Sequence, residues 1–438
     1  MKPIQLQSLL TTTRQPCPAC GKVHEAGLSR VIIESGAIQK LPEIITSYGA
    51  KKVFLLADPN TYAAAGRAVE EILTREGLAF TVYLLNSQKA EPDEHAVGSV
   101  AMHFDKTCDL ILGVGSGVVN DIGKIIANLT GLPYVIFGTA PSMDGYASAT
   151  SSVIRDGLKY SLPSVCPDTV VGDLDILCAA PMRMILAGLG DMLAKYVSLV
   201  EWQMAVIING EYYCSYVADL VREALEQCVA NLEGLTRREP EAVKAVMNGM
   251  VLSGIAANYA GISRPVSGME HYISHILDMR GVEFGTKTDL HGIQCGVGTL
   301  MALEMYEELC KITPDREKAL AFVRTFDMEE WKRDLRHHLG TGAEAMIANE
   351  EKEGKYDPEK HAARLEIILS HWEELCALMK SLPSAKELTE KLAAIGMPTT
   401  LEEIGFTAEE AQAALRLSKN IRDKYVGTRL LWDLGLEK

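Results

Sequence analysis

Three histidines and one aspartate in the second half of the chain have the residue types and spacing of a metal site. His271 and His275 stand four residues apart and would share one face of a helix, so that one could bind an ion while the other carries a proton. Asp191 interrupts an apolar helical pattern, where a carboxylate is costly unless it is paired or metal-bound. With His291, these side chains suit Zn²⁺, Ni²⁺ or Fe²⁺ and leave positions for substrate oxygens. A salt bridge from Asp191 to Lys195 is the alternative.

A glycine-rich run, GVGSGVVND at residues 113–121, follows a strand-like segment and precedes a helix-like one. Glycines there let the backbone approach a pyrophosphate, and the first N–H groups of the helix face the anion. The run departs from the standard dinucleotide fingerprint because Asn120 stands where the third glycine would be. A tight turn between strand and helix is therefore the alternative to a cofactor loop. The predicted cofactor residues in this run are Gly115, Ser116, Gly117, Val118, Val119, Asn120 and Asp121.

Two further segments end strand-like runs with polar side chains. Asp58 is placed to accept hydrogen bonds from a ribose 2′-OH, which favours NAD over NADP, although capping of a helix explains it equally well. The segment at residues 138–148, GTAPSMDGYAS, is rich in hydroxyls and small residues. Loops at the carboxyl ends of parallel strands line the ligand crevice, which makes Thr139, Ser142, Asp144 and Ser148 candidate contacts. An ordinary polar loop is the alternative.

Near the N-terminus, Cys17-Pro-Ala-Cys20 and His24 could supply half of a zinc site. No second CxxC or matching pair follows at the spacing of a structural zinc site. The sequence therefore favours a surface loop over a weak metal-binding knuckle.

The elements that must position these residues change character along the chain. In the first 170 residues, strand-like runs at 52–57, 80–85, 109–114 and 133–137 alternate with helix-like stretches at 63–76 and 120–129, which predicts a mostly parallel, Rossmann-like sheet. Later segments have apolar residues at helical spacing, at 182–208, 216–235, 241–259 and 361–381. We predict an α/β dinucleotide-binding domain at 1–175 and an all-helical metal- and substrate-binding domain at 176–438. The charged stretch 349–361 reads as a solvated loop or helix face.

Bulk composition excludes several classes of protein. The net charge of −15 repels phosphate backbones and anionic membranes, so we expect no nucleic-acid partner and a local cluster of cations wherever a phosphorylated substrate binds. Ten cysteines without a regular framework indicate a reducing compartment. The first sixteen residues lack a signal-peptide core, and no 18-residue uncharged apolar stretch occurs. We therefore expect a cytoplasmic protein without stable membrane insertion.

Taken together, these motifs resemble the sn-glycerol-1-phosphate dehydrogenases, within the superfamily of iron-containing alcohol dehydrogenases and dehydroquinate synthases. The resemblance runs from about Val53 to Leu430 and rests on GVGSGVVND, TAPSMDGYASA, GDMLAK, SRPVSGMEHYISH and the His-Gly at His291. It implies a dehydroquinate synthase-like fold, a homodimer, NAD(P)H and one divalent metal (Zn, Ni or Fe). It also implies roles for individual residues: Asp191, His271 and His291 as metal ligands, Asp144, Asp191 and His275 as substrate contacts, and Thr139, Ala140, Pro141, Ser142 and Ser148 as cofactor contacts beside the glycine loop and Asp58.

The expected activity is metal-assisted hydride transfer between NAD(P)H and a small phosphorylated polyol, with a role in phospholipid metabolism following from that substrate. The metal would polarise the substrate oxygen, His275 would relay the proton and Asp144 would hold a hydroxyl. Arg264 is the first candidate for the phosphate, with Lys159 and Lys195 behind it, because arginine binds phosphate in a bidentate manner. The alternatives are a dehydrogenase of unphosphorylated polyols and a non-catalytic binding protein of the same fold. A dehydroquinate synthase-like lyase fits less well. The pattern of that branch has a glutamate at the first ligand and GHxxGH at the second, whereas this chain has Asp191 and MEHYISH.

Overall fold

The computed structural model describes residues 6–10, 15–86, 90–155 and 158–437, so part of the N-terminal segment assessed for a signal peptide lies outside the described residues. The chain divides into two compact units. Unit 1 comprises Met1–Met192 and Tyr216–Ile262, and unit 2 comprises Leu193–Ser215 and Ser263–Lys438.

Unit 1 contains a six-stranded parallel sheet with the strand order β1-β8-β5-β4-β2-β3. The predicted strands are confirmed to within one residue as β2–β5, whereas β1, β8 and the antiparallel hairpin β6-β7 were not predicted. The chain leaves β2 toward β3 on one side and returns to β4 on the other, so the carboxyl ends of β2 and β4 form a switch point, where such sheets bind ligands. The strands are β1 (Arg30–Glu34), β2 (Lys52–Ala57), β3 (Ala79–Leu84), β4 (Leu110–Gly115), β5 (Tyr134–Gly138), β6 (Thr150–Arg155), β7 (Leu158–Pro163) and β8 (Thr169–Asp173).

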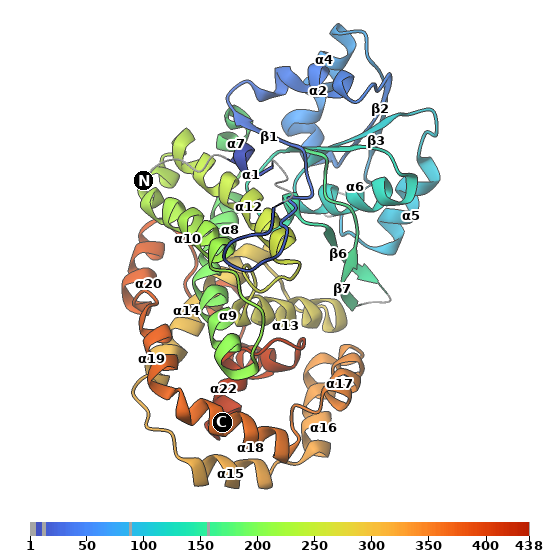
Figure 1. Ribbon diagram of the computed structural model, residues 1–438. Helices are drawn as coiled ribbons and strands as arrows, with labels where there is room; N and C mark the ends of the chain where they lie inside the picture. The colour runs from blue at the N-terminus through green and yellow to red at the C-terminus, as the bar shows by residue number, and fades with distance from the viewer. Residues whose placement is uncertain (1–5, 11–14, 87–89, 156–157, 438) are drawn as a thin grey trace. The chain divides into compact units, whose positions relative to one another are not determined.

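Helices cover both faces of this sheet (Figure 1). Alternate residues of β2 and β4 form one buried cluster with apolar side chains of α2 and α4, while α6 packs against β4 and against α5. The helical elements of unit 1 are α1 (Leu6–Leu9), η1 (Ala37–Lys40), α2 (Leu41–Ser47), α3 (Pro59–Thr61), η2 (Tyr62–Gly66), α4 (Arg67–Arg75), α5 (Glu94–His103), α6 (Gly117–Thr130), η3 (Asp144–Ala147), α7 (Leu174–Ala179), α8 (Met182–Leu193), α10 (Ser215–Ala230), α11 (Leu232–Thr236) and α12 (Pro240–Ala260).

The described residues of unit 2 form helices and no strand. The predicted helical stretches are present, but three of them are broken: 182–208 at Ala194, 216–235 at Asn231 and 361–381 at His371. None of the described helices of either unit has the length and apolar character needed to cross a bilayer. The helical elements of unit 2 are α9 (Lys195–Asn209), α13 (Met269–Phe284), α14 (His291–Leu309), α15 (Arg316–Arg324), α16 (Met328–Leu339), α17 (Gly342–Glu353), α18 (Pro358–Ser370), α19 (Trp372–Lys380), α20 (Ala385–Ala394), η4 (Glu402–Ile404), α21 (Ala408–Leu417), η5 (Ser418–Asn420) and α22 (Gly427–Asp433).

The boundaries of the two compact units differ from those of the predicted domains 1–175 and 176–438. Helix α12 packs against η3, α7 and β1, so this helix belongs with the sheet although its sequence looks like that of the helical half. The predicted assignment of cofactor binding to one domain and metal binding to the other stays a prediction.

Candidate active site

The glycine loop joins β4 to α6 at the switch point of the sheet. A Cβ at Gly115 would lie 2.6 Å from the Val119 side chain, so the turn into the helix requires glycine there. A Cβ at Gly117 would meet only Met143, at an ordinary 3.4 Å. Gly117 is thus not needed for packing, and its backbone opens the first turn of α6, where N–H groups can face an anion.

Two other glycines let β4 and α6 pack closely. The Tyr134 hydroxyl is buried where a Cβ on Gly113 would lie 2.5 Å away and a Cβ on Gly123 would overlap it. Close packing of helix on strand is the task of the third glycine in the standard fingerprint. Gly123 performs it here, one turn beyond Asn120.

Asn120 and Lys124 are both completely buried and hold the second loop. Asn120 Nδ2 donates to the Gly145 carbonyl at 2.9 Å, and Lys124 Nζ donates to the same oxygen and to Ser148 Oγ, each at 3.3 Å. Lys124 also forms an ion pair with Asp121 at 2.9 Å. Burial nevertheless raises the pKa of the Asp121 carboxyl above its usual value. Of the predicted cofactor residues, Asn120, Asp121 and Ser148 therefore have structural partners within unit 1.

Asp144 and Asp191 are brought together within unit 1. The backbone N–H of Asp144 donates to Asp191 Oδ2 at 2.9 Å, and each side chain offers an oxygen within 4.8 Å of the other. Helix α8 approaches this loop so closely that a Cβ at Gly188 would overlap the Pro141 carbonyl oxygen. Asp191 is fully buried, as the interrupted apolar pattern predicted.

Asp58 caps α3 at the carboxyl end of β2. Its Oδ1 accepts from the N–H groups of Asn60 at 2.7 Å and Thr61 at 2.9 Å. The capping alternative is thus present in the structure. Because β2 neighbours β4, Asp58 also stands at the switch point, and the ribose contact stays a prediction.

In unit 2, two of the predicted ligands lie close enough to share an ion. His271, His291 and Cys295 each offer a ligand atom, and the three atoms lie within 4.8 Å of one another. His271 Nδ1 is 2.8 Å from Glu270 Oε1, and an ionised carboxylate can only accept. The hydrogen is therefore on Nδ1, and the lone pair for an ion is on Nε2.

A hydrogen-bonded chain orients His291. Gln294 Nε2 donates to Asp278 Oδ1 at 2.8 Å and to Ser274 Oγ at 2.9 Å, and Ser274 Oγ lies 2.8 Å from His291 Nδ1. For His291 to bind an ion through Nε2, its Nδ1 must donate to Ser274. His275 stacks on His291, a predicted ligand, with ring centroids 5.7 Å apart.

The carboxyl groups of Glu201 and Glu270 are buried at the start of α13, the helix that carries His271. Glu201 accepts from the Met269 N–H at 2.9 Å and from the Tyr306 hydroxyl at 2.7 Å, and burial beside Glu270 raises the pKa of Glu201. Among the described residues, Glu270 Oε2 is buried without a hydrogen-bond partner. A cation nearby would favour the ionised form of a carboxyl group buried in this way.

Arg264, the first candidate for the phosphate, is 3% exposed and already engaged. Its guanidinium is in bidentate contact with Glu211 and donates to the Tyr425 carbonyl at 2.7 Å. Phosphate binding would have to displace Glu211. Lys195 is fully buried and Lys159 is partly exposed.

The sequence analysis did not identify the residues that support these side chains. Ser274, Gln294 and Lys124 are polar residues within helices, and partners of each come from other helices or loops. Glu270 contacts its neighbour His271. Cys295 had a local signal, because it lies four residues after His291.

Comparison with known proteins connects this geometry to a family. The family model for iron-containing alcohol dehydrogenases matches residues 32–181. A glycerol-1-phosphate dehydrogenase (NAD(P)+) from Halalkalibacterium halodurans is 34% identical over 292 residues, which cover 66% of this chain and 73% of the relative. The chain belongs to the glycerol-1-phosphate dehydrogenase family.

Other members align over nearly the full length of the chain. The glycerol-1-phosphate dehydrogenase of Bacillus licheniformis is 28% identical over 421 residues, 95% of this chain and 92% of the relative. A crystal structure of a probable glycerol dehydrogenase from Sinorhizobium meliloti has a TM-score of 0.59 at 17% identity and covers 92% of both chains. The predicted family resemblance and the predicted fold class are both confirmed.

Proposed function

We propose that this member of the family interconverts dihydroxyacetone phosphate and sn-glycerol-1-phosphate by hydride transfer with NAD(P)H, using one divalent metal. The observation that carries the proposal is the 34% identity to a glycerol-1-phosphate dehydrogenase over two thirds of the chain. The close approach of His271 and His291 supports it. Zinc, nickel and iron remain the candidate ions.

The residues of unit 2 fit such an ion. Glu270 fixes the tautomer of His271, Ser274 and Gln294 orient His291, and the buried carboxylates supply the compensating charge. Asp191 would be the remaining ligand, as predicted from the sequence. When bound, the metal would act as a Lewis acid that favours alkoxide character on the substrate.

The side chains of the enzyme would bind and orient the reactants. The first turn of α6 would hold the pyrophosphate, with Thr139, Ala140, Pro141, Ser142 and Ser148 beside it. Asp58 would contact the ribose and favour NAD. Asp144 would hold a substrate hydroxyl, and His275 would carry the proton between substrate and solvent, because its ring is partly exposed and stacks on a ligand.

The cellular compartment and the oligomeric state belong to the same proposal. The ten cysteines lack the regular spacing of a disulfide framework, which is the basis for the predicted reducing compartment, the cytoplasm. A homodimer and a role in phospholipid metabolism are parts of the same proposal.

The test is oxidation of NADH and NADPH by metal-stripped protein given dihydroxyacetone phosphate, with Zn²⁺, Ni²⁺, Fe²⁺ or no metal added back. We expect turnover only with metal, with sn-glycerol-1-phosphate as the product. Turnover confined to dihydroxyacetone would replace the proposal with an unphosphorylated-polyol dehydrogenase, and metal binding without any turnover would favour a binding protein.

His271→Ala tests the ligand assignment. We expect loss of metal-dependent turnover by at least about a hundredfold, since second-shell changes alone cost ten- to a hundredfold. His95→Ala, which removes an exposed histidine of α5, is the matched control and should keep wild-type turnover. Equal turnover of the two variants would contradict the assignment.

A further inference from the structure

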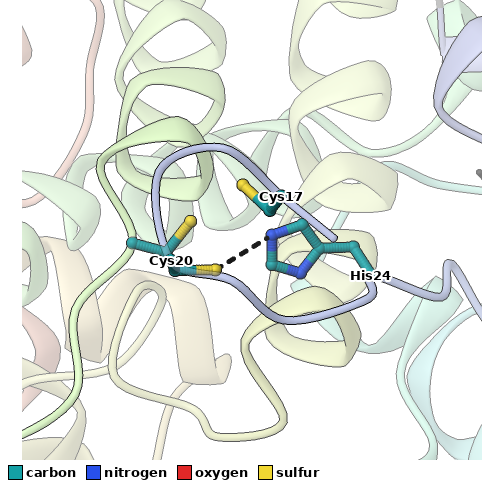
Figure 2. A group of neighbouring side chains, drawn as sticks. Cys17, Cys20 and His24 are labelled. Atoms are coloured by element: carbon teal, nitrogen blue, oxygen red, sulfur yellow. Dashed lines mark hydrogen bonds between the residues drawn. The ribbon is translucent and has the colours of Figure 1, made fainter. Parts of the chain in front are cut away.

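The N-terminal CxxC motif and His24 gather into one cluster in unit 1, which the proposed activity does not use. Cys17, Cys20 and His24 each offer a ligand atom, and these atoms lie within 4.8 Å of one another. Figure 2 shows both thiols and the imidazole directed toward a common centre from a single loop. Cys17 and His24 are buried, and Cys20 is partly exposed.

The backbone of the loop has the tight turn that a CxxC pair needs in order to bind one ion. The Gly21 N–H donates to the Cys17 carbonyl at 2.7 Å, and the Cys17 N–H donates to the Lys22 carbonyl at 2.8 Å. Gly21 has a φ of 73°, which favours glycine. The sequence CPACG thus folds both cysteines back toward the same side.

The ring of His24 is oriented as in many metal sites. Its Nδ1 is 2.8 Å from the Tyr259 carbonyl oxygen. A carbonyl can only accept, so Nδ1 carries a hydrogen, which in the neutral ring leaves the lone pair on Nε2. Metal-binding histidines commonly make this backbone contact, because it fixes both tautomer and ring orientation.

The spacing fits tetrahedral zinc. His24 Nε2 is 3.6 Å from Cys20 Sγ. With Zn–S near 2.3 Å and Zn–N near 2.05 Å, the S–N edge of a tetrahedron is about 3.5 Å. Two thiolates and one neutral imidazole would cancel the charge of Zn²⁺, so the site needs no further counter-ion.

We propose that Cys17, Cys20 and His24 bind a structural zinc ion, separate from the metal of the active site. Its role is to fasten the N-terminal segment to α12. His24 stacks on Tyr259 with centroids 5.0 Å apart, and Asn258 Nδ2 donates to the Ala26 carbonyl at 2.7 Å. The segment around the cluster has no helix or strand, so metal binding would supply much of its order. The sequence favoured a plain surface loop at this motif, and the zinc content of the protein decides between the two.

The test counts zinc in the full-length protein after reconstitution and removal of excess metal. The double variant Cys17→Ser/Cys20→Ser should hold one zinc ion fewer per chain than wild type. Cys178→Ser, a partly exposed cysteine outside the cluster, is the matched control and should match wild type. His271→Ala should retain the cysteine-bound ion, so failure of the proposed active-site metal would not be confused with failure of this proposal.

Cobalt substitution identifies the ligands. In His271→Ala protein loaded with Co²⁺, we expect near-ultraviolet thiolate charge-transfer absorption that the Cys17→Ser/Cys20→Ser changes abolish. His24→Phe keeps a ring on Tyr259 but should lose the ion, whereas His24→Cys should keep it. A third thiolate ligand would appear as extra absorption and would be located by replacing the other cysteines in turn.

Two results would overturn the proposal. One is equal zinc content in wild type and in the double variant. The other is a Cys17–Cys20 disulfide, seen as a loss of two mass units, that forms as readily in Zn²⁺-loaded protein as in metal-free protein. If the double variant does not fold, thiol modification of wild-type protein decides the question, because release of one zinc ion should accompany reaction of these two thiols.

Discussion

Replacing Lys124 with methionine should destabilise unit 1 strongly, because the ammonium group is fully buried and contacts the segment that follows η3. It pairs with Asp121 at 2.9 Å and donates to carbonyl oxygens of Gly145 and Thr150. Removing one partner of a buried ion pair costs about 3–5 kcal/mol, because the other charge stays buried. The folding equilibrium constant should therefore fall by about two to three and a half orders of magnitude. Urea unfolding followed by circular dichroism would measure it.

The pH dependence of this loss identifies its cause. Burial already raises the pKa of Asp121, and loss of Lys124 raises it further. A carboxyl whose pKa is raised in the folded state gains stability as pH falls through that pKa, so the defect of Lys124→Met should shrink on acidification. Asp121→Asn/Lys124→Met should recover much of the stability at neutral pH and lack this dependence. A loss below about 1 kcal/mol, or no recovery in the double variant, would refute the reasoning.

Two further substitutions test the loops and the phosphate candidate. Gly188→Ala should force α8 away from the Pro141 carbonyl, with an overpacking cost of about 1–3 kcal/mol. Because Pro141 lies in the loop predicted to contact the cofactor, we expect kcat to fall and the KM for NADH to rise, and wild-type values of both would show that the close approach is not needed. Arg264→Ala separates two roles: a phosphate contact predicts a raised KM for dihydroxyacetone phosphate alone, whereas loss of the Glu211 pair predicts a lower melting temperature with KM unchanged.

Much of the α/β part could be predicted because its local signals agree with its fold. Strands β2–β5 are buried aliphatic runs between turn residues, and the glycine loop identifies the step from strand to helix. Strand β8 was missed although it is fully buried, because TVVGD is short and ends directly in a helix cap, Asp173. The breaks at Ala194, Asn231 and His371 were missed because the apolar period continues through them.

The charged stretch 349–361 shows where composition misleads. Glu350 is 2% exposed and pairs with Arg429 at 2.9 Å, and Tyr356 and His361 are buried near Trp432. The prediction of a solvated segment was wrong at these positions. A buried charge of this kind depends on a partner 79 residues away, which local charge counting cannot reveal.

The same limit applies to the supports of the active site. The types and spacing of His271, His291 and Asp191 carry a signal of their own, because few structural roles call for them in apolar helices. Their positioning residues carry none, since a glutamine or a serine in a helix is common.

Helix α12 shows how such hidden supports connect distant segments of unit 1. Near its end, Asn258 Nδ2 donates to the carbonyls of both Ala26 and Ala147. A Cβ at Gly254 would lie 2.5 Å from the Ala147 carbonyl carbon, so the helix also packs directly against η3, which begins at Asp144. One turn of α12 thus holds the segment that follows the cysteine cluster and the loop predicted to contact substrate. The Asn258 amide bonds both segments, so disorder in the N-terminal segment would reach Asp144 through a single side chain. A structural metal at Cys17, Cys20 and His24 would therefore affect catalysis through Asn258.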